Sequence, residues 1–315
     1  MWMGPPQPVC GGPFLDDRQS LTEVFMRRSI YHRSVPYLFL LPFIAFFFVF
    51  MAYPIVFSLM LCFGKYKSAS FTFTGIGNFS FVLSDPLFFK ALFNTFLMMV
   101  IQVPVQTALA LILASLLNVK KLKGKGIMRM VVFMPVLLDA VSYSIVFGMF
   151  FNYENGIVNN VIRLLGGDGL QWLNLGWLAK TVLIIAITWR WTGYNTVIML
   201  SGLQNIPEDL YEAASIDGAG RIRQFFAITV PGLKQVLIFA VILSVNCMLQ
   251  LFTEPYLLTG GGPVNETLTI VRYLYKKGFK SFDFGVASAG SYILVLIIAA
   301  LTFLQIKVTK EDKGR

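Results

Sequence analysis

Six long stretches of the chain are almost wholly apolar, and segments rich in turn formers and charges separate them. A helix of about 20 mostly apolar residues crosses a hydrocarbon core of roughly 30 Å. Each stretch reaches that length, so the pattern predicts an all-α, polytopic membrane protein with six transmembrane helices. The expected spans lie at about 37–63, 91–117, 127–151, 179–202, 235–258 and 284–306.

These spans divide the chain into three parts. Residues 1–35 form an N-terminal tail without an apolar core, so we expect the first span to serve as its own insertion signal. Residues 36–306 form the transmembrane domain, which includes a long polar loop at about 203–233, and residues 307–315 form a C-terminal tail. An even number of spans puts both tails on the same side of the membrane.

Basic residues indicate which side that is, because Lys and Arg are enriched in cytoplasmic loops. Of the 26 basic residues, 16 lie in the tails and in the loops after spans two and four, and nine lie in the other loops. The bias predicts that both tails and the 203–233 loop are cytoplasmic. It is imperfect, since the last outer loop carries four cations: Arg272, Lys276, Lys277 and Lys280.

Composition agrees with a membrane protein. The chain is 56% hydrophobic and 13% charged, whereas soluble domains average roughly 45–50% and about 25%. The net charge of +10 follows the topology pattern, so we do not expect a nucleic-acid partner. Three cysteines, two of them inside apolar runs, do not form a disulfide framework.

The cytoplasmic loop has the pattern of a helix–turn–helix. Pro207 and the acidic residues that follow it suit a first helical turn. Ala213 and Ala214 favour a helix and leave its face without bulk. Asp217-Gly218 allows a sharp turn, and a second, apolar helical stretch leads to Pro231 at the membrane. We interpret the loop as a docking element beneath the bilayer rather than a solvated connector.

The loop also resembles the EAA loop of ABC importer permeases. Its pattern is Glu-Ala-Ala, two residues, Asp-Gly-Ala, eight residues and Ile-Thr-Val-Pro, over residues 212–231. The one departure is Val230, where the family usually has Leu. In that family the loop is the coupling helix that seats in a cleft of a cytoplasmic ATPase subunit.

The resemblance implies roles for individual residues of the loop. Glu212 is expected to meet a basic group on the ATPase, Ala213 and Ala214 to permit close approach, and Gly218 to allow the turn. Asp217 is assigned either to the coupling surface or to a local helix cap. We expect these five residues to form the ATPase-coupling site.

The resemblance extends over roughly residues 35–307. The segment GIGNF after span one is similar to the family's G-L-x-N-[FY] segment, and LLTGGGPVNET is similar to the loop before the last span in MalF-type sugar permeases. Lactose, raffinose-type and glycerol-phosphate permeases of that branch share the second motif. The resemblance therefore implies the ABC importer type I permease fold, in the MalF-like half.

The chain carries no sign of catalysis. It contains no G-x-x-x-x-G-K-[ST] phosphate loop, and its single histidine, His32, has no cluster of cysteines or carboxylates around it. We therefore expect a non-catalytic subunit without a metal or cofactor of its own. Resemblance implies that ATP and Mg bind to two copies of a partner ATPase, and that rigid-body motion of the coupling loops turns the path from inward- to outward-facing.

The resemblance implies further partners and a location. These are a second homologous, MalG-like permease, an extracellular or periplasmic solute-binding protein, membrane lipid and a sugar or oligosaccharide substrate. The location is the plasma (inner) membrane of a bacterium or archaeon, with the chain crossing it several times.

Polar residues inside the spans are candidates for the substrate path, because they are costly in lipid. Aromatic faces beside amides and carboxylates suit a sugar, which offers apolar ring faces and many hydroxyls. The alternative is that these residues bond between helices or to the second permease. The candidates are Tyr143, Tyr194, Asn195, Ser244, Asn246, Gln250 and Glu254.

Two of these expectations concern geometry. Asn246, Gln250 and Glu254 are spaced by four residues, so they should form one stripe of a helix. Arg190, inside span four, requires a carboxylate partner, and either Asp139 or Glu254 can supply it. We favour a structural ion pair there.

Two rival functions account for some of these features. A gradient-driven secondary transporter or channel explains the spans and buried polar residues, but not the cytoplasmic pattern. A membrane enzyme requires a catalytic cluster, which the sequence does not offer. Within the importer hypothesis, the pattern does not separate disaccharide, oligosaccharide and glycerol phosphate.

Overall fold

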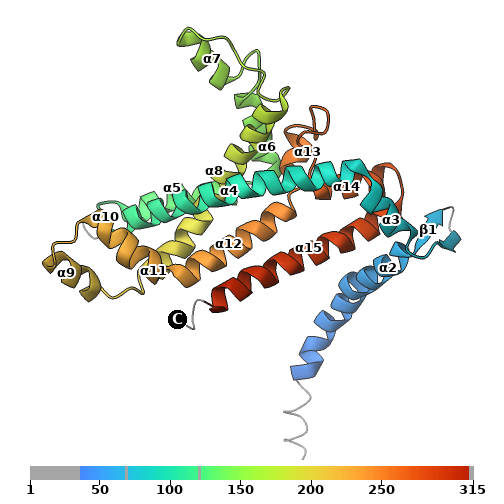
Figure 1. The fold of residues 1–315 in the computed structure, drawn as a ribbon, viewed down its shortest axis with the longest axis horizontal. Helices are drawn as coiled ribbons and strands as arrows, with labels where there is room; N and C mark the ends of the chain where they lie inside the picture. Colours follow the sequence, from blue (N-terminus) through green and yellow to red (C-terminus); the bar gives the residue numbers. More distant parts are fainter. Residues whose placement is uncertain (1–35, 68–69, 120–121, 312–315) are drawn as a thin grey trace, which may run out of the picture. The chain divides into compact units, whose positions relative to one another are not determined.

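The computed structural model describes residues 36–67, 70–119 and 122–311, with side chains as far as residue 307, so the predicted N-terminal tail lies outside the described residues. Apart from one hairpin and the connecting loops, the described part is helical (Figure 1). The longer helices are α2 (Tyr53–Cys62), α4 (Pro86–Asn118), α5 (Lys125–Leu137), α6 (Ala140–Phe150), α8 (Gly176–Leu203), α12 (Lys234–Leu249) and α15 (Phe284–Glu311). The shorter ones are α3 (Gly77–Ser84), α7 (Ile157–Leu164), α9 (Asp209–Ile216), α10 (Arg221–Gln224), α11 (Val230–Gly232), α13 (Thr253–Leu257) and α14 (Ile270–Tyr275).

Three single π-helical turns accompany these helices: η1 (Phe48–Ala52), η2 (Phe225–Thr229) and η3 (Lys276–Lys280). The chain divides into two compact units, residues 1–58 and 59–315. In the first unit, the described segment from Pro36 to Ser58 is helical and has no buried residue. The second unit contains all the elements discussed below.

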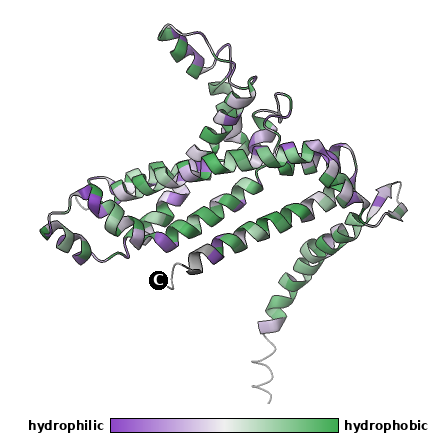
Figure 2. Ribbon diagram, viewed as in Figure 1, coloured by the Kyte–Doolittle hydropathy of each residue, from purple (hydrophilic) through white to green (hydrophobic). Residues whose placement is uncertain are grey.

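Four helices of the described chain are long and apolar enough to cross a membrane: Pro36–Cys62, Pro86–Asn118, Lys234–Leu257 and Phe284–Lys307. A fifth crossing results if the bent pair α5 and α6 counts as one span. The predicted count of six also requires α8, which is long enough at 28 residues but carries a polar and charged stretch around Arg190. The protein is thus a multi-pass membrane protein. Figure 2 shows that most residues of α4, α12 and α15 are hydrophobic.

The prediction of one continuous helix at 127–151 is wrong. The segment consists of α5 and α6, whose axes differ by 96°. Pro135 lies two residues before the end of α5 and cannot donate a backbone hydrogen bond. Asp139 then caps α6, where its carboxylate accepts a 2.9 Å hydrogen bond from the amide of Val141. Asp139 is exposed and is therefore a helix cap rather than a buried charge.

The predicted stripe in span five is also interrupted. α12 ends at Leu249, Gln250 is its C-terminal cap, and α13 begins at Thr253. Asn246 and Gln250 remain one turn apart, with the Gln250 Nε2 donating to the Asn246 carbonyl at 3.3 Å. Glu254 lies beyond the break on a separate helix, so it does not continue their stripe.

A short hairpin follows α2, where the sequence suggested only turns. β1 (Gly64–Lys67) pairs with β2 (Ser70–Phe73) in antiparallel register. Asn78, from the GIGNF segment, is buried behind it. Its Nδ2 donates to the carbonyls of Leu61, Cys62 and Gly64 at 3.4, 3.0 and 2.8 Å. The amide thus satisfies carbonyls at the end of α2, which explains why this position is polar.

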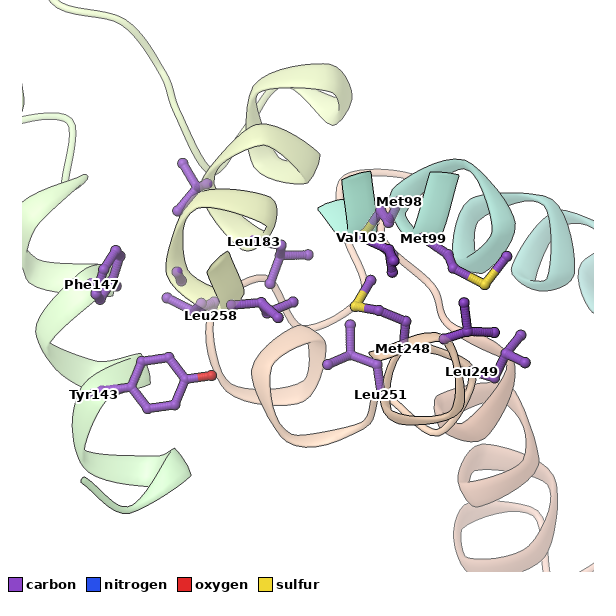
Figure 3. Close-up of a cluster of buried hydrophobic side chains, with 14 of the residues drawn as sticks. Met98, Met99, Val103, Tyr143, Phe147, Leu183, Met248, Leu249, Leu251 and Leu258 are labelled. Atoms are coloured by element: carbon purple, nitrogen blue, oxygen red, sulfur yellow. The ribbon is translucent and has the colours of Figure 1, made fainter. Parts of the chain in front are cut away.

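The main core lies between α4, α6, α8 and the α12–α13 segment (Figure 3). Met98 and Val103 of α4 pack there with Phe147 of α6, Leu183 of α8 and Met248 of α12. A close approach of two backbones fixes α5 on α8: a Cβ at Gly193 would lie 1.9 Å from the Val132 carbonyl oxygen. Only glycine fits at that position, as is common where membrane helices touch.

The bundle has two distinct ends (Figure 1). At one end lie α9, α10 and α11, between the C-terminus of α8 and the N-terminus of α12. At the other end lie α3, α14 and the loop that leads from α13 to α14. α15 continues to Glu311, past the predicted boundary at residue 306.

Candidate functional site

The segment from α9 to α11 has the predicted helix–turn–helix form. α9 ends in a Schellman turn, in which the amide of Gly218 donates to the Ser215 carbonyl and that of Ala219 to the Ala214 carbonyl, at 3.1 and 2.8 Å. Gly218 is left-handed, with φ of 76°. This conformation is open to glycine and strained for most other residues. Asp217 is the C-terminal cap position of α9, and its backbone amide donates to the Ala213 carbonyl at 3.0 Å.

The predicted coupling residues are mostly on the surface. Glu212, Ala213, Asp217 and Gly218 are exposed, and Ala214 is half-buried. Exposed apolar side chains flank them: Leu210, Ile216, Ile222 and Phe226, of which Ile216 is 87% exposed. An exposed apolar patch rimmed by charges is typical of a protein–protein contact.

Side-chain bonds hold this segment in shape. The hydroxyls of Tyr211 and Thr229 are 3.0 Å apart, which joins α9 to η2. The Gln224 Nε2 donates to Ser215 Oγ at 2.8 Å and to the Ala219 carbonyl at 2.9 Å. Hydrogen bonds from η2 and from α10 therefore stabilise α9 and the turn that follows it.

Glu212 also borders a cleft of about 510 Å³ between α5, the end of α8 and α9. Lys125 and Arg129 of α5 line the opposite wall. Within the described residues, neither cation forms an ion pair with Glu212. Its carboxylate thus stays available to a group outside the chain.

A small cavity of about 40 Å³ lies between α4, α8 and α12. Three predicted path residues line it: Tyr194, Asn195 and Ser244. Asn195 Nδ2 donates to Ser244 Oγ at 3.0 Å, so one bond joins the α8 and α12 walls. Trp191 adds an aromatic wall and meets the Tyr194 ring edge to face, with centroids 5.9 Å apart.

Sequence reasoning missed two residues of this cavity, Gln102 and Gln106 of α4. They are buried and hydrogen-bonded to each other, while the Gln102 Oε1 has no partner in the described structure. Two amides four residues apart in an otherwise apolar span were the available indication. The cavity thus offers an unused acceptor to a polar ligand.

The other path candidates lie outside the cavity lining. Asn246 donates to the Ile242 carbonyl at 2.9 Å, and Gln250 is exposed beyond it. Tyr143 and Glu254 are buried together, with the phenol donating to the carboxylate. Figure 3 shows the Tyr143 ring pointing from α6 toward the α12–α13 segment.

Glu254 is also the partner of Arg190. The Arg190 Nη1 lies 3.6 Å from the Glu254 Oε1, so the structure selects Glu254 over Asp139. The guanidinium lies 5.0 Å from the centroid of the Tyr143 ring and 5.3 Å from that of Trp191. The predicted ion pair is confirmed, and it includes a tyrosine from a third helix.

The end opposite α9 is fixed by ion pairs. Lys90 and Lys180 each lie 2.8 Å from an oxygen of Glu266, and Lys90 also donates to the Val264 carbonyl at 3.0 Å. The hydrogen bonds from Lys180 and Lys90 lower the pKa of Glu266 to about 2. These contacts tie the TGGGPVNET loop to the first turns of α4 and α8.

A second cluster at this end includes part of the positive charge that lies opposite α9. Lys277 lies 2.9 Å from Asp85, and the Tyr273 phenol donates to the same carboxylate at 2.8 Å. Burial alone would raise the pKa of Asp85, but these hydrogen bonds lower it overall. Arg272 donates to the carbonyl of Gly260. Two of the four cations that disturb the charge bias thus hold the loop together.

Comparison with known proteins identifies a family. Residues 106–308 match the binding-protein-dependent transport system inner membrane component family. The chain is 43% identical over 282 residues to the lactose transport system permease LacF of Rhizobium radiobacter, covering 88% of this chain and 94% of that protein. It is 34% identical to the trehalose/maltose transport system permease MalF of Thermococcus litoralis, covering 86% and 92%.

A solved structure has the same fold. A bacterial ABC transporter that imports the acidic polysaccharide alginate contains a chain that superposes with a TM-score of 0.79 at 20% identity, covering 91% of this chain and 99% of that one. The family match, the relatives and the exposed helix–turn–helix all indicate the same class. The chain therefore belongs to the binding-protein-dependent ABC importer permeases and is a non-catalytic, membrane-embedded subunit of such an importer.

Proposed function

We propose that this permease passes a neutral sugar or short oligosaccharide across the membrane. Relatives that match most of the chain are permeases for lactose, arabino-oligosaccharides and trehalose or maltose. The cavity supports the same class, because amides, a hydroxyl and aromatic rings line it and no charged side chain does. That neutral lining is the observation that carries the proposal, and it favours a sugar over glycerol phosphate.

The path proposal centres on Tyr194, Asn195 and Ser244, with Gln102 beside them. Their polar atoms can exchange hydrogen bonds with sugar hydroxyls, and the rings of Tyr194 and Trp191 offer surfaces for a sugar face. A cavity of about 40 Å³ is too small for a sugar. The remainder of the path would come from a second, MalG-like permease.

Coupling is assigned to the exposed segment around α9. Glu212 would pair with a basic group on a cytoplasmic ATPase, Ala213 and Ala214 would allow close approach, and Asp217 and Gly218 would form the turn that seats in its cleft. Two ATPase copies would bind ATP and Mg, and an external solute-binding protein would deliver the sugar. In support, one solved relative of the same fold is a transporter in complex with a periplasmic protein that holds an alginate pentasaccharide.

We further propose six crossings with both termini in the cytoplasm of a bacterium or archaeon. This topology puts α9 and the basic loop before α5 on the ATPase side. It counts α8 as a crossing despite its polar stretch, since that stretch faces the cavity and the Glu254 pair.

The first test is purification of the native assembly through a C-terminal tag, followed by mass spectrometry. We expect an ATPase, a second permease and a solute-binding protein, whose ligand is then measured by calorimetry with lactose and arabino-oligosaccharides. A homo-oligomer without ATPase would contradict the coupling proposal. A binding protein that takes glycerol phosphate but no sugar would contradict the substrate class.

A further inference from the structure

The trio Tyr143, Arg190 and Glu254 lies on one side of the cavity. Along α8, Arg190 precedes Tyr194 by one turn, roughly 6 Å toward the end opposite α9. Along span five, Glu254 follows the cavity residue Leu251 in the same direction. Both offsets place the trio beyond the level of the cavity, toward the end opposite α9.

Its members come from three different elements, two of which follow a break. Tyr143 is on α6, beyond the 96° bend, and Glu254 is on α13, beyond the interruption at Gln250. Arg190 is on the continuous helix α8. The ion pair and the phenol hydrogen bond thus attach two segments, each of which follows a break in its span, to one continuous helix.

The contacts of the trio stabilise its closed arrangement, but they leave one hydrogen-bond donor unused, so the arrangement can also be released. Charges buried in a membrane protein require each other, because an unpaired one is costly. Yet the pair is not saturated: its closest atoms are 3.6 Å apart, and the Arg190 Nε is buried without a hydrogen-bond partner. A pair optimised only for stability would use that donor.

We propose that Tyr143, Arg190 and Glu254 form a latch that closes the path on the outer side of the cavity. The latch holds α6 and α13 against α8, and its release lets both outer segments swing away when the path opens outward. This inference rests on the proposed function, since it presumes that the cavity lies on the transport path.

Cys247 provides a natural probe for the latch. It lines the cavity on the inner side of the trio and is exposed to a reagent that reaches it there, whereas Cys62 is fully buried. In a Cys10→Ser background, the assembled complex in right-side-out vesicles is treated with a membrane-impermeant maleimide, without ATP. Glu254→Gln removes one charge of the latch, and we expect it to raise the labelling rate of Cys247 about 5-fold or more.

Two further variants test the latch without leaving an unpaired buried charge, which could itself cause misfolding. The double variant Arg190→Gln with Glu254→Gln leaves no unpaired charge, and Tyr143→Phe removes only the hydroxyl; both should also raise labelling. Glu154→Gln, an exposed carboxylate on the loop after α6, is the matched control and should not change it.

The outcomes decide the proposal. Faster labelling in the latch variants but not in Glu154→Gln supports it. Unchanged labelling in the double variant overturns it, and so does the absence of labelling in every variant when the denatured chain labels normally. The assay needs no sugar, so failure of reconstituted complex to import lactose or arabino-oligosaccharides would count against the proposed substrate and not against the latch.

Discussion

The two ends of the bundle differ in whether their carboxylates form ion pairs within the chain. At the end opposite α9, Glu266 pairs with two lysines of the same chain and Asp85 with one, at 2.8–2.9 Å. At the α9 end, Glu212 and Asp217 are exposed and have no ion pair among the described residues, and Ile216 lies open beside them. Glu266 and Asp85 are thus paired within the chain, whereas Glu212 and Asp217 remain free to contact a partner. Substitutions at the two ends should therefore affect different properties, coupling at one and local stability at the other.

The strongest test of this contrast is Gly218→Asp. A Cβ at Gly218 meets nothing within 4 Å in this chain, so the substitution adds backbone strain, bulk and charge at the surface without an internal clash. We expect it to abolish the ATPase activity that binding protein and sugar stimulate in the assembled complex. Gly124→Asp is the matched control, since Gly124 has φ of 75° and equally open surroundings. Normal stimulation in Gly218→Asp would refute the coupling role of the turn.

Glu212→Gln should have the next largest effect. Loss of a charged hydrogen bond to the ATPase is worth about 1.5–3 kcal/mol, so stimulated ATPase activity should fall about tenfold or more. Asp209→Asn, another exposed carboxylate of α9, serves as control. Equal loss in both variants would point to the general charge of α9 rather than to a specific contact.

A smaller effect is expected at the cavity. Asn195→Ala removes an amide that the proposed path offers to a sugar hydroxyl, a bond worth about 1 kcal/mol, and should raise the KM for sugar uptake about 5-fold with less change in kcat. Asn246→Ala, outside the cavity lining, is the comparison. If Asn246→Ala changes KM more than Asn195→Ala does, the path runs along another face of α12.

Glu266→Gln should have the smallest effect, because partly exposed ion pairs contribute little. Its pKa is about 2 in the fold against an ordinary value of 4.5, so the ionised carboxylate stabilises the fold above pH 4.5. That contribution is lost as the pH falls from 4.5 toward 2. We expect the unfolding midpoint to drop by about 2 °C at neutral pH, and the difference from the parent to shrink in acid. A constant difference at all pH values would contradict the ion-pair explanation.

The sequence predicted the coupling segment better than the spans. The turn at Asp217-Gly218 depends on local preferences, and the structure has it where expected. The breaks at Leu138 and Gln250 were missed because both lie in apolar stretches, where hydropathy does not record that a helix has stopped. Asp139 was one of two possible partners for Arg190, whereas in the structure it caps α6 through the amide of Val141.

The candidate site shows a similar division. Tyr194, Asn195 and Ser244 meet at the cavity, and they were candidates because they are polar residues inside predicted spans. Glu254 was expected in the Asn246 stripe and instead pairs with residues 64 and 111 positions away, a tertiary contact that one sequence does not encode locally. Gln102 and Gln106 were not considered, although two amides four residues apart in an apolar span can be recognised from the sequence.

The hydroxyl contact between Tyr211 and Thr229 has a consequence for transport efficiency. It is a direct bond from α9 to η2, which leads through α11 into α12 and its cavity wall at Ser244. A coupling helix that moves without carrying α12 along would still trigger its ATPase. With that bond weakened, ATP hydrolysis would be less tightly coupled to sugar import, and each sugar imported would consume more ATP.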